Sequence, residues 1–244
     1  MCYLMLRNKN KCTLEEDLIR SKKIWDKKKV LQLVYHSWYN KIRPYIKKGT
    51  TVEFSCGIGN FKEYYKKCYS SDIRYYPWED FTADALNMPI KSNSVDNIVV
   101  VDGLHHFPRP YEFIKEAQRT LKKNGRLLLI EPYISPFSYI IRKIFHHEEI
   151  NMKSLITTDK PTEANLAIPT LMFRNREKFH DKFKNLKIMK INYMDKISYL
   201  LSGGFNHKSI INEKDLKFFS KIENIFSPLN RLLGFKMTII IRKN

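Results

Sequence analysis

The stretch "VEFSCGIGNF", from Val52 to Phe61, decides the fold. An apolar run that carries one acid, Glu53, breaks into a turn of small residues containing Gly57 and Gly59. A glycine turn directly after a strand lets a ligand approach the backbone closely, because glycine has no side chain to obstruct it. We therefore expect a ligand-binding turn at the end of the first strand of a sheet.

The sequence beyond this turn alternates between strand and helix patterns. Strands are predicted at 51–55, 68–73, 80–85, 95–103 and 125–133, and an amphipathic helix is predicted at 109–123. Near-continuous apolar strands separated by helices are typical of a parallel sheet that is covered on both faces. The alternation predicts an α/β fold with a Rossmann-like, doubly wound sheet.

The two ends of the chain extend this core. Residues 14–46 have apolar side chains at helical spacing and predict an N-terminal helical cap, in which Thr13 and Glu16 form a capping box after a loose segment at 1–13. A helix is expected at 137–149, irregular structure at 150–180, and an insert with a glycine turn and an amphipathic helix at 197–226. Late strands at 186–194 and 236–243 make the sheet mostly parallel, with an antiparallel C-terminal edge strand.

We expect a single domain over residues 1–244. Residues 1–48 form its helical lead-in, 49–136 its cofactor-binding half, and 137–244 its substrate-side segments and late strands. No apolar run is long enough for a membrane span or a signal peptide, so a cytoplasmic protein is expected. The four cysteines include no C-x-x-C pair, which indicates free thiols and no zinc site.

The chain carries a formal net charge of +19 and has a pI of about 9.7. Such a balance favours contact with nucleic acid, anionic lipid or an acidic substrate. The lysines are spread from Lys9 to Lys243 rather than gathered in one stripe, so we attribute the charge to general composition more than to a binding face.

Ligands of an open parallel sheet bind beyond the carboxyl ends of its strands. A dinucleotide would need a third glycine in the turn, but Lys62 stands there, and no phosphate loop ending in Gly-Lys-Ser or Gly-Lys-Thr occurs. A ligand with adenosine and an amino acid instead needs carboxylates. Asp72 is placed to accept from the two ribose hydroxyls, Asp84 from the adenine amino group, and Glu53 can anchor the turn or face an ammonium.

The segment from Val52 to about Pro136 resembles the class I S-adenosylmethionine-dependent methyltransferases. "VEFSCGIGNF", "SSDI", "DALNMPIKSNSVDNIVVVDGLHHFPRP" and "EAQRTLKKNGRLLLIEPY" are similar to four of their motifs, in the right order. The resemblance implies S-adenosylmethionine as cofactor, and it implies cofactor contacts at Glu53, Ser55, Cys56, Gly57, Gly59, Asp72, Ile73, Asp84, Ala85, Leu86, Asp102 and Gly103. Ser55 departs from the pattern because it stands where the family has a glycine, and the helix after Gly59 is short.

Methyl transfer to a neutral oxygen or nitrogen can need a base. The candidates at strand ends are His106, Glu131 and Tyr133, with His105 beside them. The run "HHEE" at 146–149 offers ligand atoms, but adjacent residues do not share a helix face, so no metal site is expected. Cys56 is interpreted as a small residue that fills the turn. Tyr35, Trp38 and Tyr39 are interpreted as core residues rather than a lid. The loop residues Tyr75, Tyr76, Pro77 and Trp78, which follow the second strand, are candidates for stacking on adenine.

We expect an enzyme that transfers a methyl group to a small-molecule acceptor or to one linked to a lipid or sugar. The segment "DGLH" after the fourth strand lacks the Asn-Pro-Pro-Tyr pattern of many enzymes that methylate bases and amides. An RNA methyltransferase and a non-catalytic nucleotide-binding α/β protein are the alternatives. The methylated atom and the oligomeric state are not indicated by the sequence.

Overall fold

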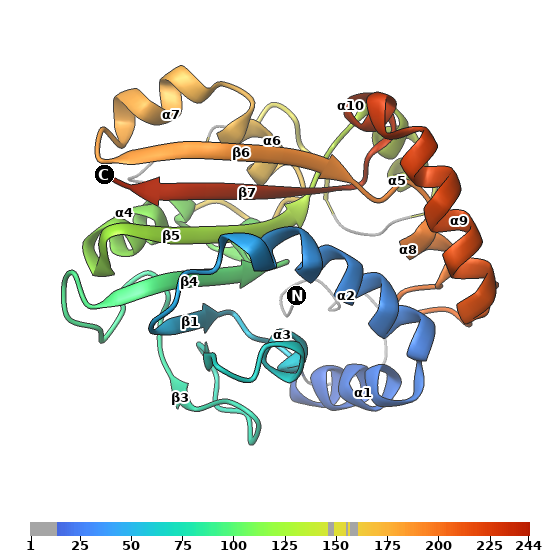
Figure 1. Ribbon diagram of the computed structural model, residues 1–244, viewed down its shortest axis with the longest axis horizontal. Helices are drawn as coiled ribbons and strands as arrows, with labels where there is room; N and C mark the ends of the chain where they lie inside the picture. The colour runs from blue at the N-terminus through green and yellow to red at the C-terminus, as the bar shows by residue number, and fades with distance from the viewer. Residues whose placement is uncertain (1–13, 146–148, 155, 157–160) are drawn as a thin grey trace.

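The computed structural model describes residues 14–145, 149–154, 156 and 161–244. The described residues form a seven-stranded sheet in the order β3-β2-β1-β4-β5-β7-β6 (Figure 1). Its strands are β1 (Thr51–Phe54), β2 (Tyr69–Asp72), β3 (Phe81–Thr82), β4 (Val95–Val101), β5 (Leu121–Pro132), β6 (Leu186–Met194) and β7 (Lys236–Lys243). The strands from β1 to β5 are parallel, and β7 is antiparallel to both β5 and β6. The Rossmann-like fold and its antiparallel C-terminal strand are confirmed, and β7 lies between β5 and β6, one place in from the edge.

The strand order reverses between β1 and β4. The chain runs outward from β1 through β2 to β3, then returns to add β4 and β5 on the other side of β1. The turns that leave β1 and β4 therefore go to opposite sides and open a crevice beyond the carboxyl ends of these two strands. The fold places the residues after β1, β2, β3 and β4 around that crevice.

Helix α2 (Lys29–Ile42) covers one face of the sheet, and α1 (Leu14–Lys27) precedes it (Figure 1). Leu31, Trp38, Tyr39 and Ile42 are fully buried and belong to a core cluster that also contains Val99, Leu128 and Ile240. The aromatic side chains at 35, 38 and 39 therefore lie in the core. The 3-10 turn η1 (Arg43–Tyr45), which contains Pro44, ends this segment.

The opposite face is covered by α4 (Pro110–Thr120), α6 (Ile168–Phe173) and α7 (Arg176–Lys182), and their apolar side chains pack on alternate residues of the same strands. The expectation of irregular structure at 150–180 is wrong for α6 and α7. A proline in the first turn of α6 and the Asn175 side chain, which accepts from the Lys178 amide, start these short helices.

The remaining helices lie beyond one end of the sheet. They are α3 (Asn60–Tyr64), η2 (Leu104–His106), α5 (Pro136–Phe145), α8 (Ser198–Leu201), α9 (Glu213–Ile225), η3 (Ser227–Leu229) and α10 (Asn230–Leu233). Helix α9 begins with a capping box between Asn212 and Asp215. The capping box at Thr13, the loose segment 1–13 and most of "HHEE" lie outside the described residues.

Candidate active site

The turn after β1 has a left-handed backbone at three positions. The φ angles are +58° at Ser55, +51° at Gly57 and +74° at Gly59. The Cys56 amide donates to the Ser71 carbonyl at 3.1 Å, which holds the turn against β2. A Cβ built on Gly57 meets no atom within 4 Å, whereas one on Gly59 would lie 2.9 Å from the Trp78 ring. Gly57 is therefore the open position at which a ligand can reach the backbone.

The Trp78 side chain is bonded to this turn. Its indole nitrogen donates to the Gly57 carbonyl at 2.7 Å, and its ring stacks on Tyr76 with centroids 5.4 Å apart. The candidate role of Trp78 in adenine stacking stays a prediction, and in this arrangement the ring braces the turn.

Asp72 ends β2 and is half-buried. Its carboxylate accepts from the Gly57 amide at 3.0 Å and from the Ile73 amide at 2.8 Å, one bond to each oxygen. A carboxylate has about four lone-pair positions, so these two bonds leave acceptor capacity on both oxygens. The Asp72 amide donates to Glu79 at 2.8 Å, which fixes the strand end. Asp72, which is predicted to bind the ribose, thus lies beside Gly57, whereas the Ile73 side chain is exposed to solvent.

Glu53 lies in β1, just before the turn, and its side chain is buried, with 1% of the residue exposed. Its Oε2 atom has no hydrogen-bond partner among the described residues. Burial, and next the nearby Asp72 carboxylate, raise the pKa of Glu53 well above its ordinary value. A buried carboxylate with an open oxygen is costly, and a cationic ligand group would offset that cost.

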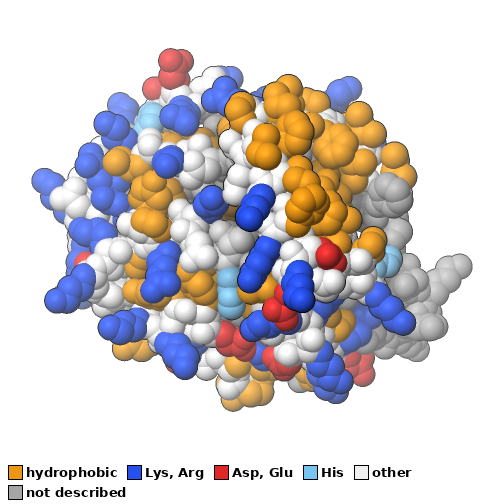
Figure 2. All heavy atoms as spheres, turned by 45° about the vertical axis from the view of Figure 1, so that its right-hand side comes forward, with side chains coloured by type: hydrophobic (Ala, Val, Ile, Leu, Met, Phe, Trp, Pro, Cys, Tyr) orange, Lys and Arg blue, Asp and Glu red, His pale blue; other side chains and the backbone are white. Residues whose placement is uncertain are grey.

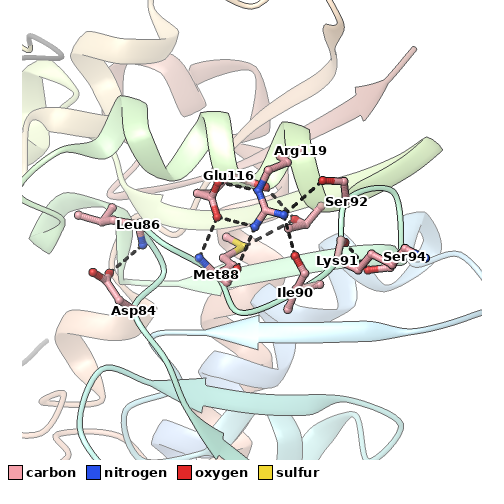
Figure 3. Close-up of polar contacts among 10 residues, drawn as sticks. Asp84, Leu86, Met88, Ile90, Lys91, Ser92, Ser94, Glu116 and Arg119 are labelled. Atoms are coloured by element: carbon pink, nitrogen blue, oxygen red, sulfur yellow. Dashed lines mark hydrogen bonds and ion pairs between the residues drawn. The ribbon is translucent and has the colours of Figure 1, made fainter.

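The loop after β3 carries Asp84, Ala85 and Leu86. The Asp84 carboxylate is exposed and accepts from the Leu86 amide at 2.8 Å, and Ala85 is buried. Figure 3 shows how α4 holds the following residues: Glu116 accepts from the Met88 amide at 2.8 Å, and Arg119 donates to the Met88 carbonyl at 2.8 Å. Arg119 also donates to the Ile90 carbonyl at 2.7 Å and to Glu116.

The residues after β4 form the opposite wall. Asp102 has a φ of +51° and forms an ion pair with Lys236, the first residue of β7. Burial acts to raise the pKa of Asp102, but the Lys236 ammonium and then His105 outweigh it and hold the pKa below its ordinary value. Asp102 is therefore a fixed negative charge beside the crevice.

Glu131, near the end of β5, organises η2. One of its oxygens accepts from the amides of Gly103 and Leu104 at 3.0 and 2.8 Å, and the other lies 2.8 Å from Nδ1 of His105. Since Glu131 is fully buried and uses both oxygens in these contacts, its geometry suits a structural anchor. Its candidacy as a base stays a prediction that these contacts do not favour.

The other two candidate bases differ in their surroundings. The Tyr133 hydroxyl donates to the Arg231 carbonyl at 3.0 Å, so its proton is already engaged. The Nδ1 atom of His106 is buried and has no partner among the described residues. Burial, and next His105, lower the pKa of His106 well below its ordinary value. A neutral imidazole with a free nitrogen can accept a proton.

Cys56 is buried, and burial above all raises the pKa of its thiol well above the usual range. A protonated, buried thiol is a poor nucleophile. Within the described ranges, no group of three or more His, Cys, Asp or Glu side chains is arranged to hold a metal ion.

Residues 52–129 match the model of a family described as a methyltransferase domain. The chain is 40% identical over 50 residues to a ubiquinone/menaquinone biosynthesis C-methyltransferase of Ruegeria sp., which is 20% of each protein. It is 27% identical over 128 residues to the protein of the same name from Agrobacterium fabrum, covering 50% of this chain and 49% of that protein. The chain thus spans at most about half the length of these curated relatives.

Two solved structures share the fold. An S-adenosylmethionine-dependent methyltransferase from Archaeoglobus fulgidus superimposes with a TM-score of 0.55 at 19% identity, covering 87% of this chain and 94% of that one. One from Thermotoga maritima superimposes with a TM-score of 0.50 at 16% identity, covering 93% and 99%. Over residues 52–129 the chain is thus similar to a methyltransferase domain, and it shares the fold of these two S-adenosylmethionine-dependent methyltransferases.

The site fits S-adenosylmethionine in its chemistry. Gly57 leaves the backbone open, Asp72 keeps acceptor capacity for hydroxyl donors, and the open oxygen of Glu53 suits a cationic group. The residues that would hold the cofactor are therefore those of the turn, with Asp72 for the ribose and the Asp84–Leu86 loop for the base. These assignments are proposals.

Three residues that hold the site in place could not be identified from the sequence. They are Lys236, which pairs with Asp102, and Glu116 and Arg119, which hold the loop after β3. The spacing of Glu116 and Arg119 on the predicted helix indicates an ion pair, but nothing local indicates that they also bind a loop some 30 residues earlier. Lys236 has no local signal, because it meets Asp102 only through the pairing of β7 with β5.

Proposed function

We propose that this protein transfers a methyl group from S-adenosylmethionine to a small-molecule acceptor or to one linked to a lipid or sugar. The observation that carries the proposal is the half-buried Asp72 carboxylate, with capacity to accept from hydroxyls, beside the open backbone of Gly57 at the strand-order switch. The match of residues 52–129 to a methyltransferase domain supports it, as does the similarity to two C-methyltransferases.

Bound S-adenosylmethionine supplies an electrophilic methyl group on a sulfonium sulfur. The protein contributes alignment: Asp72 binds and orients the sugar, and the Asp84–Leu86 loop, held by Arg119, binds the base. Glu53, buried in β1 just before the turn, stabilises a cationic group there. The Asp102–Lys236 pair fixes the wall after β4, on which the acceptor is positioned.

His106 is the residue we propose to accept a proton from an oxygen or nitrogen acceptor. Its lowered pKa keeps the imidazole neutral at pH 7, and its Nδ1 atom has no competing partner among the described residues. Glu131 acts through His105 and the η2 amides, so it positions His106 rather than touching the acceptor. A carbon acceptor that is already nucleophilic would use the same alignment without the proton transfer.

The test is calorimetry with S-adenosylhomocysteine on the wild type and on Asp72→Ala. Loss of charge-assisted bonds to the ribose is expected to weaken binding by about 1.5–3 kcal/mol, roughly 10- to 150-fold. The matched control is Asp181→Ala, which removes an exposed carboxylate of α7 away from the crevice and should leave affinity unchanged. Equal affinity of the wild type and Asp72→Ala for S-adenosylhomocysteine would show that Asp72 does not bind the ribose. An RNA acceptor and a cytoplasmic location stay predictions from the sequence.

A further inference from the structure

Exposed apolar side chains gather at one corner of the molecule, formed by α5, α9 and residues 227–233. Figure 2 shows them as a broad orange area with lysine and arginine side chains along its margin. The side chains that define this corner, between 42% and 74% exposed, are Ile140, Ile144, Phe218, Ile225, Leu229 and Leu232. A folded protein rarely leaves so many large apolar side chains together in water without a partner for them.

Helix α9 presents two different faces. Leu216 and Phe219 pack inward on the core beneath α2, whereas Phe218 and Ile225 point outward. Lys214, Lys217 and Lys221 lie on the outward side as well, together with one exposed acid, Glu213, because helical residues three, four and seven apart share a face. The outward face of α9 is therefore both apolar and basic, the combination found on helices that lie in a lipid interface.

The exposed charges on α5 and on residues 217–233 are all positive. Lys143 of α5, Lys217 and Lys221 of α9, and Arg231 of α10 are exposed. The acid within this part of α9, Glu223, is directed inward, where its carboxylate accepts from the amides of Ile197 and Ser198 at 2.8 and 2.9 Å. The corner thus offers apolar groups and cations but no neighbouring exposed anion on α5 or on 217–233 of the described chain.

A hollow of about 520 Å³ adjoins the corner on α5. Its lining includes Arg142, Lys143 and Lys153, with the single acid Glu149, so basic groups predominate there too. Tyr139 and Lys143 belong to α5, so the hollow is continuous with the apolar corner.

We infer that this corner docks on the surface of a lipid bilayer that contains anionic phospholipids. Apolar side chains enter the acyl boundary and the surrounding lysines face the headgroups, each adding about fivefold to binding near such a surface. A second copy of the chain fits less well, because two faces of the same positive charge would oppose each other. No helix in the described ranges is both long enough and apolar enough to cross a bilayer, so the docking is peripheral.

The corner also adjoins the proposed acceptor side. The Tyr133 hydroxyl donates a hydrogen bond to the backbone carbonyl of Arg231 in α10, and Tyr133 directly follows β5. Docking there would bring a lipid-linked acceptor to the crevice. This last step rests on the proposed function, whereas the docking itself does not.

The test is co-flotation of the full chain, without cofactor, with vesicles of phosphatidylcholine alone or containing about 30% phosphatidylglycerol. We expect the wild type to bind the anionic vesicles and to bind neutral ones much more weakly. Phe218→Ser with Ile225→Ser should reduce binding at least tenfold, and Lys217→Gln with Lys221→Gln should reduce binding to anionic vesicles by about tenfold or more. The matched control is Tyr69→Ser with Met189→Ser, which removes exposed apolar side chains of β2 and β6 outside the corner and should change nothing.

Three results overturn the inference. They are absence of wild-type binding to anionic vesicles, binding that both corner variants leave unchanged, and a dimer in sedimentation velocity that the Phe218 and Ile225 changes dissociate. Because these side chains are exposed, thermal melts of the variants should match the wild type. Vesicle binding needs no methyl donor, so its outcome is separate from that of the calorimetric test of Asp72.

Discussion

The backbone of Gly103, after β4, lies directly against the side chain of Ser55, after β1. A Cβ on Gly103 would stand 2.8 Å from the Cβ of Ser55 and 2.7 Å from a methyl carbon of Val100. The turns after β1 and β4, which lie on either side of the crevice, thus touch at the point where the strand order reverses. The close contact requires glycine at 103 for reasons of space, since its φ of −115° suits any residue.

Gly103→Ala is therefore expected to separate the two turns. Overpacking of this kind lowers the free energy of unfolding by about 1–3 kcal/mol, and it should weaken S-adenosylhomocysteine binding by shifting the turn after β1. Urea denaturation and calorimetry measure the two effects. The double variant Ser55→Gly with Gly103→Ala removes the Ser55 Cβ and should recover part of the loss, because Ser55 is one of the two contacts. Strict additivity of the two single changes would contradict the contact.

Arg119→Gln should loosen the loop that is proposed to bind the base. The change removes guanidinium bonds to the carbonyls of Met88 and Ile90 and to Glu116. We expect stability to fall by about 1–2 kcal/mol, S-adenosylhomocysteine affinity to fall several-fold, and amide exchange at residues 84–90 to accelerate. Lys115→Gln, on the exposed side of the same helix, is the control. If amide exchange at residues 84–90 is the same in Arg119→Gln and in the wild type, Arg119 does not position this loop.

The strands were predictable because each carries its own pattern. The run at 95–101 is β-branched and apolar, and 186–194 and 236–243 were predicted at the bounds that the structure shows. Local pattern was weaker where pairing decides the conformation. Lys122 and Lys123 were assigned to the helix at 109–123, but β5 begins at Leu121, because Leu121 pairs with Val95.

The short helices α6 and α7 lacked a usable signal for a related reason. Six or seven residues supply fewer than two turns, too little for a 3.6-residue period to stand out from the polar sequence around them. Their apolar side chains acquire meaning only when they pack on the sheet beside Leu186 and Ile188. Tertiary packing, rather than intrinsic propensity, stabilises helices of this length.

In the candidate site, the residues on the glycine turn and at the strand ends were predictable, since strand direction alone places them at one edge. The backbone at Ser55 was left open by the sequence, and its φ of +58° is the conformation that the family's glycine at this position adopts easily. Partners distant in sequence, such as Glu131 for His105, were not predictable. They depend on which strands become neighbours and on the register between them.

His106→Gln tests the proposed base. Removing the proton acceptor is expected to slow methyl transfer by about 10²–10⁴-fold to an oxygen or nitrogen acceptor, while S-adenosylhomocysteine affinity stays nearly constant. Because the pKa of His106 lies well below the ordinary value of histidine, about 6.5, the wild-type rate should stay constant down to that pH and fall only at clearly more acid pH. That limb should be absent from the variant. His207→Gln, an exposed histidine, is the control. Equal loss of cofactor affinity and rate would indicate a structural role instead.

Asp195 makes a pH-dependent contribution to stability. Burial, and next the Glu223 carboxylate, raise the pKa of Asp195 to about 7, above its ordinary value. The folded protein therefore keeps a proton that the unfolded chain releases between about pH 4 and pH 7. The stabilisation from this proton is present at low pH and is lost as the pH rises through 7, where the buried carboxylate must ionise.

Asp195→Asn should remove this dependence, because an amide stays neutral at every pH and tolerates the φ of +54° at this position. We expect the variant to be more stable than the wild type at pH 8 by about 1–3 kcal/mol, with the difference shrinking steadily as the pH falls and reaching near zero only at about pH 4. Urea denaturation across this pH range measures it. Asp181→Asn, an exposed carboxylate, provides the control. A difference between Asp195→Asn and the wild type that does not vary with pH would mean that the Asp195 carboxyl does not retain its proton in the folded protein.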